Sequence, residues 1–271
     1  MNEIRKPINR SQLRQIIGKE YFILKRKFNW LFSQKKFANK ISKKDFKHSV
    51  YKHKSLVLRP LKDVDMYLQE NKRTNLEIAI KNITQIEIMP DEYFSIWKLV
   101  GRPTKNKGYL EGLVLKSGEI DKDIGGGLCQ LGNLLFWIFA HSPLTIKERY
   151  RHGFDVFPDI NRKVPFGAGA TLSYNHIDLQ VKNETNNSFI LKLWLDKTHL
   201  IGELFSKNKI EEKYTIEERN HQIKQQLWGG YSRHNQIFKV TSSNEYSTEK
   251  MIVENHAIMM YNPYLKAQTT T

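Results

Sequence analysis

Cysteine is nearly missing from this sequence, which holds a single one, Cys129, among 271 residues. One cysteine excludes an intrachain disulfide, and it excludes the zinc sites that are built from paired cysteines. Long apolar runs are missing as well, since the longest, around residues 134–140, is far shorter than the roughly 18 residues of a membrane-spanning helix. The hydrophobic share of 39% therefore predicts a soluble globular protein.

Acidic residues are scarce at the start of the chain. The first 60 positions hold 17 Lys and Arg against 3 Asp and Glu, whereas the remaining positions hold 27 against 25. A cationic segment of this kind indicates an anionic partner, such as a lipid surface or a nucleic acid. The sequence contains no zinc-finger, RNP or helix-turn-helix pattern, so we expect no sequence-specific nucleic-acid partner.

The basic segment has the apolar periodicity of a helix. Between residues 11 and 40, apolar side chains recur three and four positions apart, at Leu13, Ile16, Ile17, Tyr21, Leu24, Phe28, Leu31, Phe32 and Phe37. This amphipathic helix either packs on the domain with its basic face in solvent or lies on an anionic membrane surface. Because Arg14, Lys19 and Glu20 interrupt any apolar core after residues 1–10, we predict no secretory signal and expect a cytoplasmic location.

Several later stretches have the pattern of β-strands. We predict strands at residues 86–89, 144–150, 170–174, 177–181, 189–195 and 199–205, and a hairpin over 111–123 that turns at Ser117–Gly118. The predicted fold is α+β: a mainly antiparallel sheet packed by the helix that follows a glycine-rich loop, preceded by a basic helical extension. We divide the chain into a basic amphipathic helical extension, 1–57, a central domain, 58–206, and a charged C-terminal extension with some strand, 207–271.

The single cysteine occupies a position that favours chemistry. Cys129 follows Gly125, Gly126 and Gly127 and begins an apolar, helix-like run. A helix N-terminus offers unpaired N–H groups and a partial positive charge, which favour a thiolate or a bound anion. Three interpretations remain open: a reactive thiol, a glycine loop that binds phosphate or carboxylate, or an inert core cysteine beside glycines that allow close packing.

A thiol enzyme also needs a base, an acid that orients the base, and donors for an oxyanion. His152 is the candidate base because it lies just past the predicted strand 144–150. The backbone N–H groups around residues 127–130 or the Gln130 amide would supply the donors. The order of nucleophile, base and acid along the chain is similar to that of papain-like enzymes and transglutaminases.

The orienting acid is less well defined. Asp155, Asp159 and Asp178 are candidates, and Asp178 is best placed if its strand lies beside the one that ends at His152. Glu148 lies four residues before His152 and can instead pair with an arginine. Neither His-Glu-x-x-His nor paired-cysteine spacing is present, so we expect no metal and no cofactor.

The residues around Cys129 resemble the signature of the VanW family. The motifs that carry this resemblance are Gly125–Gln130, Leu134–Phe136, Glu148–Arg149 with His152, Phe94–Trp97, Leu99–Val100, Gly108–Tyr109, Ile177–Leu179 and Lys182–Thr185. The sequence departs from the family pattern at Gly169, where a Gly-x-Asp-Ala-Thr segment would have its acid, and at Tyr150, where many members have a histidine. The resemblance covers roughly half the chain and implies a role in glycopeptide resistance or the cell envelope.

Two functions of different class follow. In the first, the protein is an accessory factor that binds a peptidoglycan precursor or a cell-envelope protein without catalysis. In the second, it is a cysteine-dependent hydrolase or acyltransferase acting on an amide bond of that material. Gly169 favours the first, because it removes an acid that the second would need. A third alternative is a basic protein that binds a nucleic acid or a membrane surface through residues 1–57.

Overall fold

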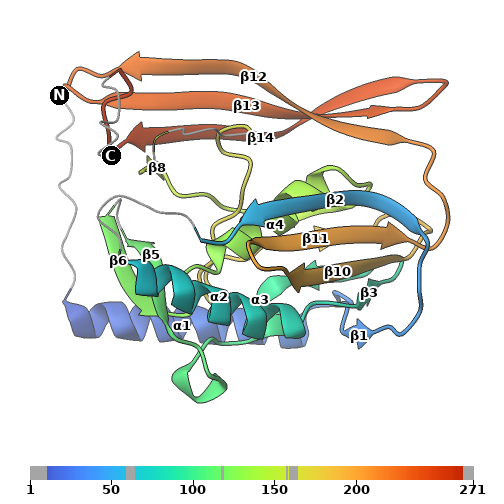
Figure 1. Ribbon diagram of the computed structural model, residues 1–271, viewed down its shortest axis with the longest axis horizontal. Coiled ribbons are helices and arrows are strands. Elements are labelled where there is room, and N and C mark those ends of the chain that lie inside the picture. The colour runs from blue at the N-terminus through green and yellow to red at the C-terminus, as the bar shows by residue number, and fades with distance from the viewer. Residues whose placement is uncertain (1–10, 59–64, 117–118, 157, 159–163, 265–271) are drawn as a thin grey trace.

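The computed structural model describes residues 11–58, 65–116, 119–156, 158 and 164–264, and it has the predicted α+β class. Among these residues the sheets are mainly antiparallel, and few helices accompany them (Figure 1). None of the helices combines the length and the apolar character that crossing a membrane requires, as far as the described residues extend.

The largest sheet has five antiparallel strands. Their order is β1 (Lys40–Ile41), β3 (Ile86–Ile88), β10 (Phe189–Leu195), β11 (His199–Ser206) and β2 (His48–Leu56). The strands predicted at 86–89, 189–195 and 199–205 are therefore confirmed. The segment 1–57 is not helical throughout, because after α1 (Gln12–Phe32) it contributes two strands to this sheet.

Two helices pack against the sheet. Helix α4 (Cys129–Ala140) contacts β2 and β11, and α2 (Met66–Lys81) contacts β10. Gly202 of β11 makes the approach of α4 close, because a Cβ there would lie 2.7 Å from Ile138 Cδ1. The short helix α3 (Ile96–Val100) and the 3₁₀ turn η1 (Lys105–Lys107) precede the hairpin of β5 (Glu111–Lys116) and β6 (Glu119–Ile124). That hairpin was predicted, and its turn at Ser117–Gly118 lies outside the described residues.

A small three-stranded sheet contains the strand that follows α4 in the chain. It consists of β4 (Tyr93–Ser95), β9 (Gln180–Lys182) and β7 (Thr145–Glu148). The strand predicted at 170–174 is wrong, since only an isolated bridge joins Ser173 and Ile177. The backbone N–H groups of this segment do not all bond to one neighbouring strand. The Thr171 N–H donates to the Tyr150 carbonyl, and the Leu172 N–H donates to Cys129 Sγ.

The C-terminal part forms a long antiparallel ribbon of β12 (Lys213–Gln225), β13 (Tyr231–Ser242) and β14 (Ser247–Met259), and β8 (Phe154–Asp155) pairs in parallel with β14. In Figure 1 the ribbon lies above the five-stranded sheet. Phe166 joins the two parts, because the guanidinium groups of Arg151 and Arg233 lie 4.1 and 4.3 Å from its ring centroid. The Asn235 amide also donates to the Phe166 carbonyl.

Candidate functional site

Cys129 makes its hydrogen bonds with the backbone of a neighbouring loop. Its Sγ accepts from the Leu172 N–H at 3.4 Å and donates to the Leu172 carbonyl at 3.7 Å. Burial raises the pKa of the Cys129 thiol, and the backbone hydrogen bonds with Leu172 and within Cys129 offset this only in part. The environment therefore favours the neutral thiol over the nucleophilic thiolate.

The glycine loop is occupied by contacts within the protein. The N–H groups of Gly125, Gly126 and Gly127 donate to the carbonyls of Leu110, Asp123 and Leu113, in that order. A Cβ on Gly126 would lie 2.0 Å from the Gly112 carbonyl oxygen, so this glycine lets the loop meet β5. These three N–H groups are thus directed at backbone carbonyls of the protein.

Gln130, the predicted oxyanion donor, holds the edge strand of the large sheet. Its Nε2 donates to Ser55 Oγ and to the Leu56 carbonyl, each at 2.9 Å. The amide is therefore engaged with β2, and its N–H groups are not available to a substrate beside Cys129 while these bonds persist.

His152 and Cys129 contact consecutive residues of one loop, Thr171 and Leu172. The backbone N–H of His152 donates to Thr171 Oγ1 at 3.1 Å, and no hydrogen bond between His152 and Cys129 is found within the described part of the chain. Desolvation, helped by the nearby charge of Arg151, lowers the pKa of His152. A neutral thiol and a neutral imidazole do not form the ion pair that activates catalytic cysteines.

Asp178 is fully buried and its oxygens are engaged by groups other than His152. They accept from Ser95 Oγ at 2.6 Å, from the Trp97 N–H at 3.2 Å and from Gln180 Nε2 at 3.2 Å. Burial raises the pKa of Asp178 to about 6, although these hydrogen bonds lower it in part. The carboxylate therefore organises α3 and β9 around itself.

Asp155, another candidate acid, makes no hydrogen bond with His152 among the contacts of the described residues. Asp155 is buried, and its Oδ2 accepts from Tyr261 Oη at 3.0 Å and lies 3.5 Å from Arg233 Nη1. Asp159 lies outside the described residues. The roles that the sequence assigned to His152 and its orienting acid thus stay predictions.

Glu148 anchors the N-terminal helix. Its two carboxylate oxygens accept from Arg26 Nη1 and Nη2 at 2.7 and 2.8 Å, and Oε1 also accepts from the Asp178 N–H at 3.0 Å. This bidentate ion pair joins α1 to β7. Glu148 thus pairs with an arginine, which was the alternative predicted for it.

Arg149 organises the loop that carries Gly169. Its Nε donates to the Gly169 carbonyl at 2.7 Å and its Nη2 donates to the Gly167 carbonyl. Desolvation, with the charge of Arg151, lowers the pKa of Arg149 to about 10. Gly169 itself faces Asn133, because a Cβ at position 169 would lie 2.3 Å from Asn133 Oδ1. That oxygen accepts from the Ala170 N–H at 2.9 Å, so an amide from α4 fills the space where an acidic side chain would begin.

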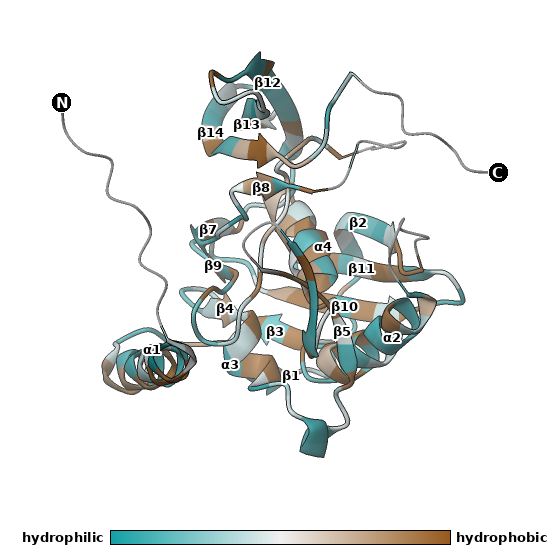
Figure 2. Cartoon of the chain, turned by 90° about the vertical axis from the view of Figure 1, so that its left-hand side faces the viewer, coloured by the Kyte–Doolittle hydropathy of each residue, from teal (hydrophilic) through white to brown (hydrophobic). Residues whose placement is uncertain are grey.

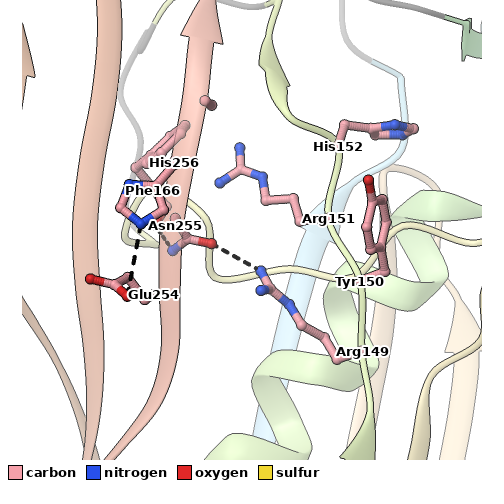
Figure 3. A pocket seen from close by; sticks show the side chains of 9 residues that line it. Arg149, Tyr150, Arg151, His152, Phe166, Glu254, Asn255 and His256 are labelled. Atoms are coloured by element: carbon pink, nitrogen blue, oxygen red, sulfur yellow. Dashed lines mark hydrogen bonds and ion pairs between the residues drawn. The ribbon is translucent and has the colours of Figure 1, made fainter. Parts of the chain in front are cut away.

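A cavity of about 210 Å³ opens where the segment after β7 faces the C-terminal ribbon. Its walls are formed by Arg149, Tyr150, Arg151, His152, Phe166, Glu254, Asn255, His256 and Ala257. Figure 3 shows Arg151 and Arg149 on one side and the side chains of β14 on the other. Figure 3 shows the two guanidinium groups directed toward the side chains of β14, whereas the His152 ring points away from them. Glu254 is the single carboxylate of the lining, and it lies 3.8 Å from His256 Nε2, so the cavity suits an anionic group such as a carboxylate or phosphate.

The structure thus brings together two of the predicted residues, Arg149 and His152, with three that the sequence analysis did not select, Glu254, Asn255 and His256. The period-two alternation of β14 places Asn255 on the buried face with Val253 and Ala257, whereas Glu254 and His256 lie at exposed positions, so no single sequence pattern identifies all three. Within the described residues, no group of three or more His, Cys, Asp or Glu is placed to hold a metal ion.

The central part of the chain is similar to known proteins. Residues 71–205 match the family model described as VanW like protein. The vancomycin B-type resistance protein VanW of Enterococcus faecalis is 38% identical over 167 residues, which are 62% of this chain and 61% of that protein. The uncharacterized protein YoaR of Bacillus subtilis is 30% identical over 142 residues, which are 51% of this chain and 44% of that protein. The aligned region covers less than two thirds of either relative, and no solved structure matches the chain.

The region that matches the family model supplies only part of the cavity wall. Arg149, Arg151, His152 and Phe166 lie inside residues 71–205, whereas β14 lies outside that range, and so does α1. One wall of the cavity therefore belongs to the part of the chain shared with relatives, and the other wall comes from the C-terminal ribbon.

Proposed function

Because this chain belongs to the VanW family, we propose that it is an accessory protein of glycopeptide resistance or peptidoglycan metabolism that binds an anionic cell-wall precursor without covalent catalysis. The name of the Enterococcus relative supports the context of vancomycin resistance. The cavity beside β14 supports the binding chemistry. Precursors that still carry their nucleotide are cytoplasmic, and the proposal places the protein there.

The observation that carries this proposal is the hydrogen bonding of Cys129. Its Sγ is engaged with both the N–H and the carbonyl of Leu172 and not with His152, and burial raises the pKa of the thiol. A thiol without a base at hydrogen-bond distance is a weak nucleophile at neutral pH. Binding therefore accounts for these residues better than acyl transfer does.

The cavity offers groups that recognise the charged parts of a precursor. Arg151 stacks on Phe166, so its guanidinium is held in a fixed orientation at the cavity (Figure 3). Arg149 is held by two backbone carbonyls and supplies a second positive charge. Planar guanidinium groups match carboxylate and phosphate oxygens, which both occur in nucleotide-linked muramyl peptides. We assign Arg151 as the side chain that contacts the ligand.

A calorimetric titration with UDP-muramyl pentapeptide tests the proposal. We expect wild type and Cys129→Ala to bind with equal affinity, and Arg151→Gln to bind at least about tenfold more weakly because a charge-assisted hydrogen bond is lost. Arg219→Gln is the matched control, since Arg219 also stacks on an aromatic ring but lies away from the cavity. Absence of binding by the wild type, or equal affinity for Arg151→Gln, would contradict the proposal.

The rival function is a cysteine-dependent hydrolase or acyltransferase with the papain-like or transglutaminase-like order of residues. It requires the His152 ring to reach Cys129 Sγ and an acid to reach the other ring nitrogen. Incubation of the same precursor with wild type and Cys129→Ser separates the two functions. Loss of a peptide or amino acid from the precursor that depends on Cys129 would establish the rival.

A further inference from the structure

Helix α1 turns one hydrophobic face away from the protein. The exposed apolar residues include Leu13, Leu31 and Phe32, with exposed fractions of 68, 75 and 77%. With Ile17, Tyr21, Leu24 and Phe28, which are also exposed, they follow helical spacing and form one face, here called the outer stripe. A helix that only packed on the domain would bury such a stripe, whereas the stripe of α1 stays exposed in the part of the chain that the structure describes.

The opposite face of α1 is fixed to the domain. Ile23 on that face is 2% exposed, and the Arg26–Glu148 ion pair joins the helix to β7. Arg102 pairs with Glu20 through two contacts of 2.6 and 3.1 Å, one turn before Ile23. Figure 2 views α1 along its axis at the margin of the molecule, apart from the C-terminal ribbon. These contacts fix the orientation of the helix, so the outer stripe points away from the body of the protein.

Positive charge surrounds the outer stripe. Arg14, Lys25 and Lys27 are exposed on α1, and Lys35 and Lys36 follow shortly after its end. The only acidic residue of the helix is Glu20, which is paired with Arg102. An apolar face flanked by lysine and arginine is the pattern of a helix that lies in the plane of an anionic membrane.

The composition of α1 determines how the helix would be oriented relative to a membrane. Its 21 residues would span about 30 Å, but its five basic side chains exclude a path through the hydrocarbon. An orientation parallel to the surface buries the outer stripe and leaves the lysines among phosphate groups. Tyr21 can place its hydroxyl at the level of the headgroups.

We propose that α1 docks this protein on the surface of an anionic lipid bilayer, with the outer stripe buried in the interface and the domain held above it by Arg26–Glu148 and Arg102–Glu20. The apolar face, its flanking charge and its fixed outward direction together point to this occupant. The inference does not depend on the ligand of the cavity, because α1 lies apart from the cavity lining.

Vesicle flotation with the full chain tests this proposal. We expect the wild type to float with vesicles of equal parts phosphatidylglycerol and phosphatidylcholine and not with phosphatidylcholine alone, and the binding to weaken with salt. Leu24→Glu should lower the affinity at least about tenfold, since it places a charge in the buried stripe. The matched control is Leu227→Glu, which replaces a leucine 109% exposed at the tip between β12 and β13 and should bind as wild type does.

Two kinds of result would overturn the proposal. The first comes from flotation: either the wild type does not bind the anionic vesicles, or the Leu24→Glu variant floats as well as wild type. The second is a wild-type dimer in sedimentation that Leu24→Glu converts to a monomer, with neither form binding vesicles. That outcome would assign the outer stripe to a second copy of the chain. Unchanged thermal unfolding of Leu24→Glu shows that the variant is folded.

Discussion

Gly167 shows how one residue sets the distance between the central domain and the C-terminal ribbon. Its backbone has φ of +81°, and a Cβ there would lie 2.0 Å from Asn255 Nδ2 on β14. A side chain at this position is therefore both strained and obstructed. Because Arg149 also binds the Gly167 carbonyl, the same residue holds one wall of the cavity in place.

Gly167→Ala should lower the free energy of unfolding by about 1–3 kcal/mol, through the positive φ and the displaced Asn255 side chain. Urea denaturation measures this directly. Gly153→Ala is the control, because nothing lies within 4 Å of the Cβ that it would add. If the two variants unfold at the same urea concentration, the ribbon does not approach Gly167 as described.

Asp178 makes stability depend on pH in a direction opposite to that of most carboxylates. Burial raises its pKa from 3.8 to about 6, so between these values the folded protein holds a proton that the unfolded chain has released. Stability therefore falls as the pH rises from about 4 to about 6, by on the order of 2 kcal/mol from this group.

Asp178→Asn should flatten that slope, since the amide does not titrate in this range. Urea midpoints at several pH values between 4 and 7 measure it. Glu245→Gln, at an exposed position, makes the same change of charge and should keep the wild-type slope. A wild-type stability that rises through this range and an Asp178→Asn variant with the same rise would contradict the assignment.

At the scale of elements, two ion pairs join α1 to the domain, Arg26–Glu148 and Arg102–Glu20. The Arg26–Glu148 pair is largely shielded, with side-chain exposures of 18 and 31%, and Arg26 also donates to the Asn175 and His176 carbonyls. Loss of the guanidinium leaves these acceptors without their donor. The attachment of the helix therefore depends strongly on Arg26.

Arg26→Ala should increase the rate of amide hydrogen exchange in α1 by about tenfold or more, because local opening of the helix becomes easier. Hydrogen–deuterium exchange with mass spectrometry measures this. Arg14→Ala removes an exposed arginine from the same helix and should leave its exchange unchanged. Equal protection of α1 in both variants would show that the ion pair does not hold the helix.

The elements differ in how far their sequences predict them. Strands β10 and β11 were predicted closely, because both are rich in buried apolar residues and are joined by a short polar turn. The ribbon of β12 to β14 was predicted only as some strand, since most of its residues are polar and half-exposed and its apolar alternation is weak. Residues 170–174 have strand-like composition, but their N–H groups bond to Tyr150 and Cys129 instead of a neighbouring strand.

At the scale of the molecule, the cavity joins segments that are far apart in the sequence. His152 and His256 both line the cavity, although 103 residues separate them in the sequence. No spacing pattern encodes such a meeting, so the sequence identified Arg149 and His152 but not their partners on β14. The loop and helix around Cys129 were identified as well, and their hydrogen bonds to Leu110, Leu113 and Leu172 were not predictable from residue types.

The proposed binding function requires that Cys129 is not an activated thiol. The pH dependence of its alkylation by iodoacetamide in the folded protein, in wild type and His152→Ala, tests this most directly. We predict slow reaction at neutral pH, a midpoint above the ordinary thiol value of about 8.5, and the same midpoint in both proteins, because burial and not His152 sets the pKa of Cys129. A midpoint below pH 7 that rises when His152 is removed would contradict the proposed function and establish an activated thiol, as a thiol enzyme requires.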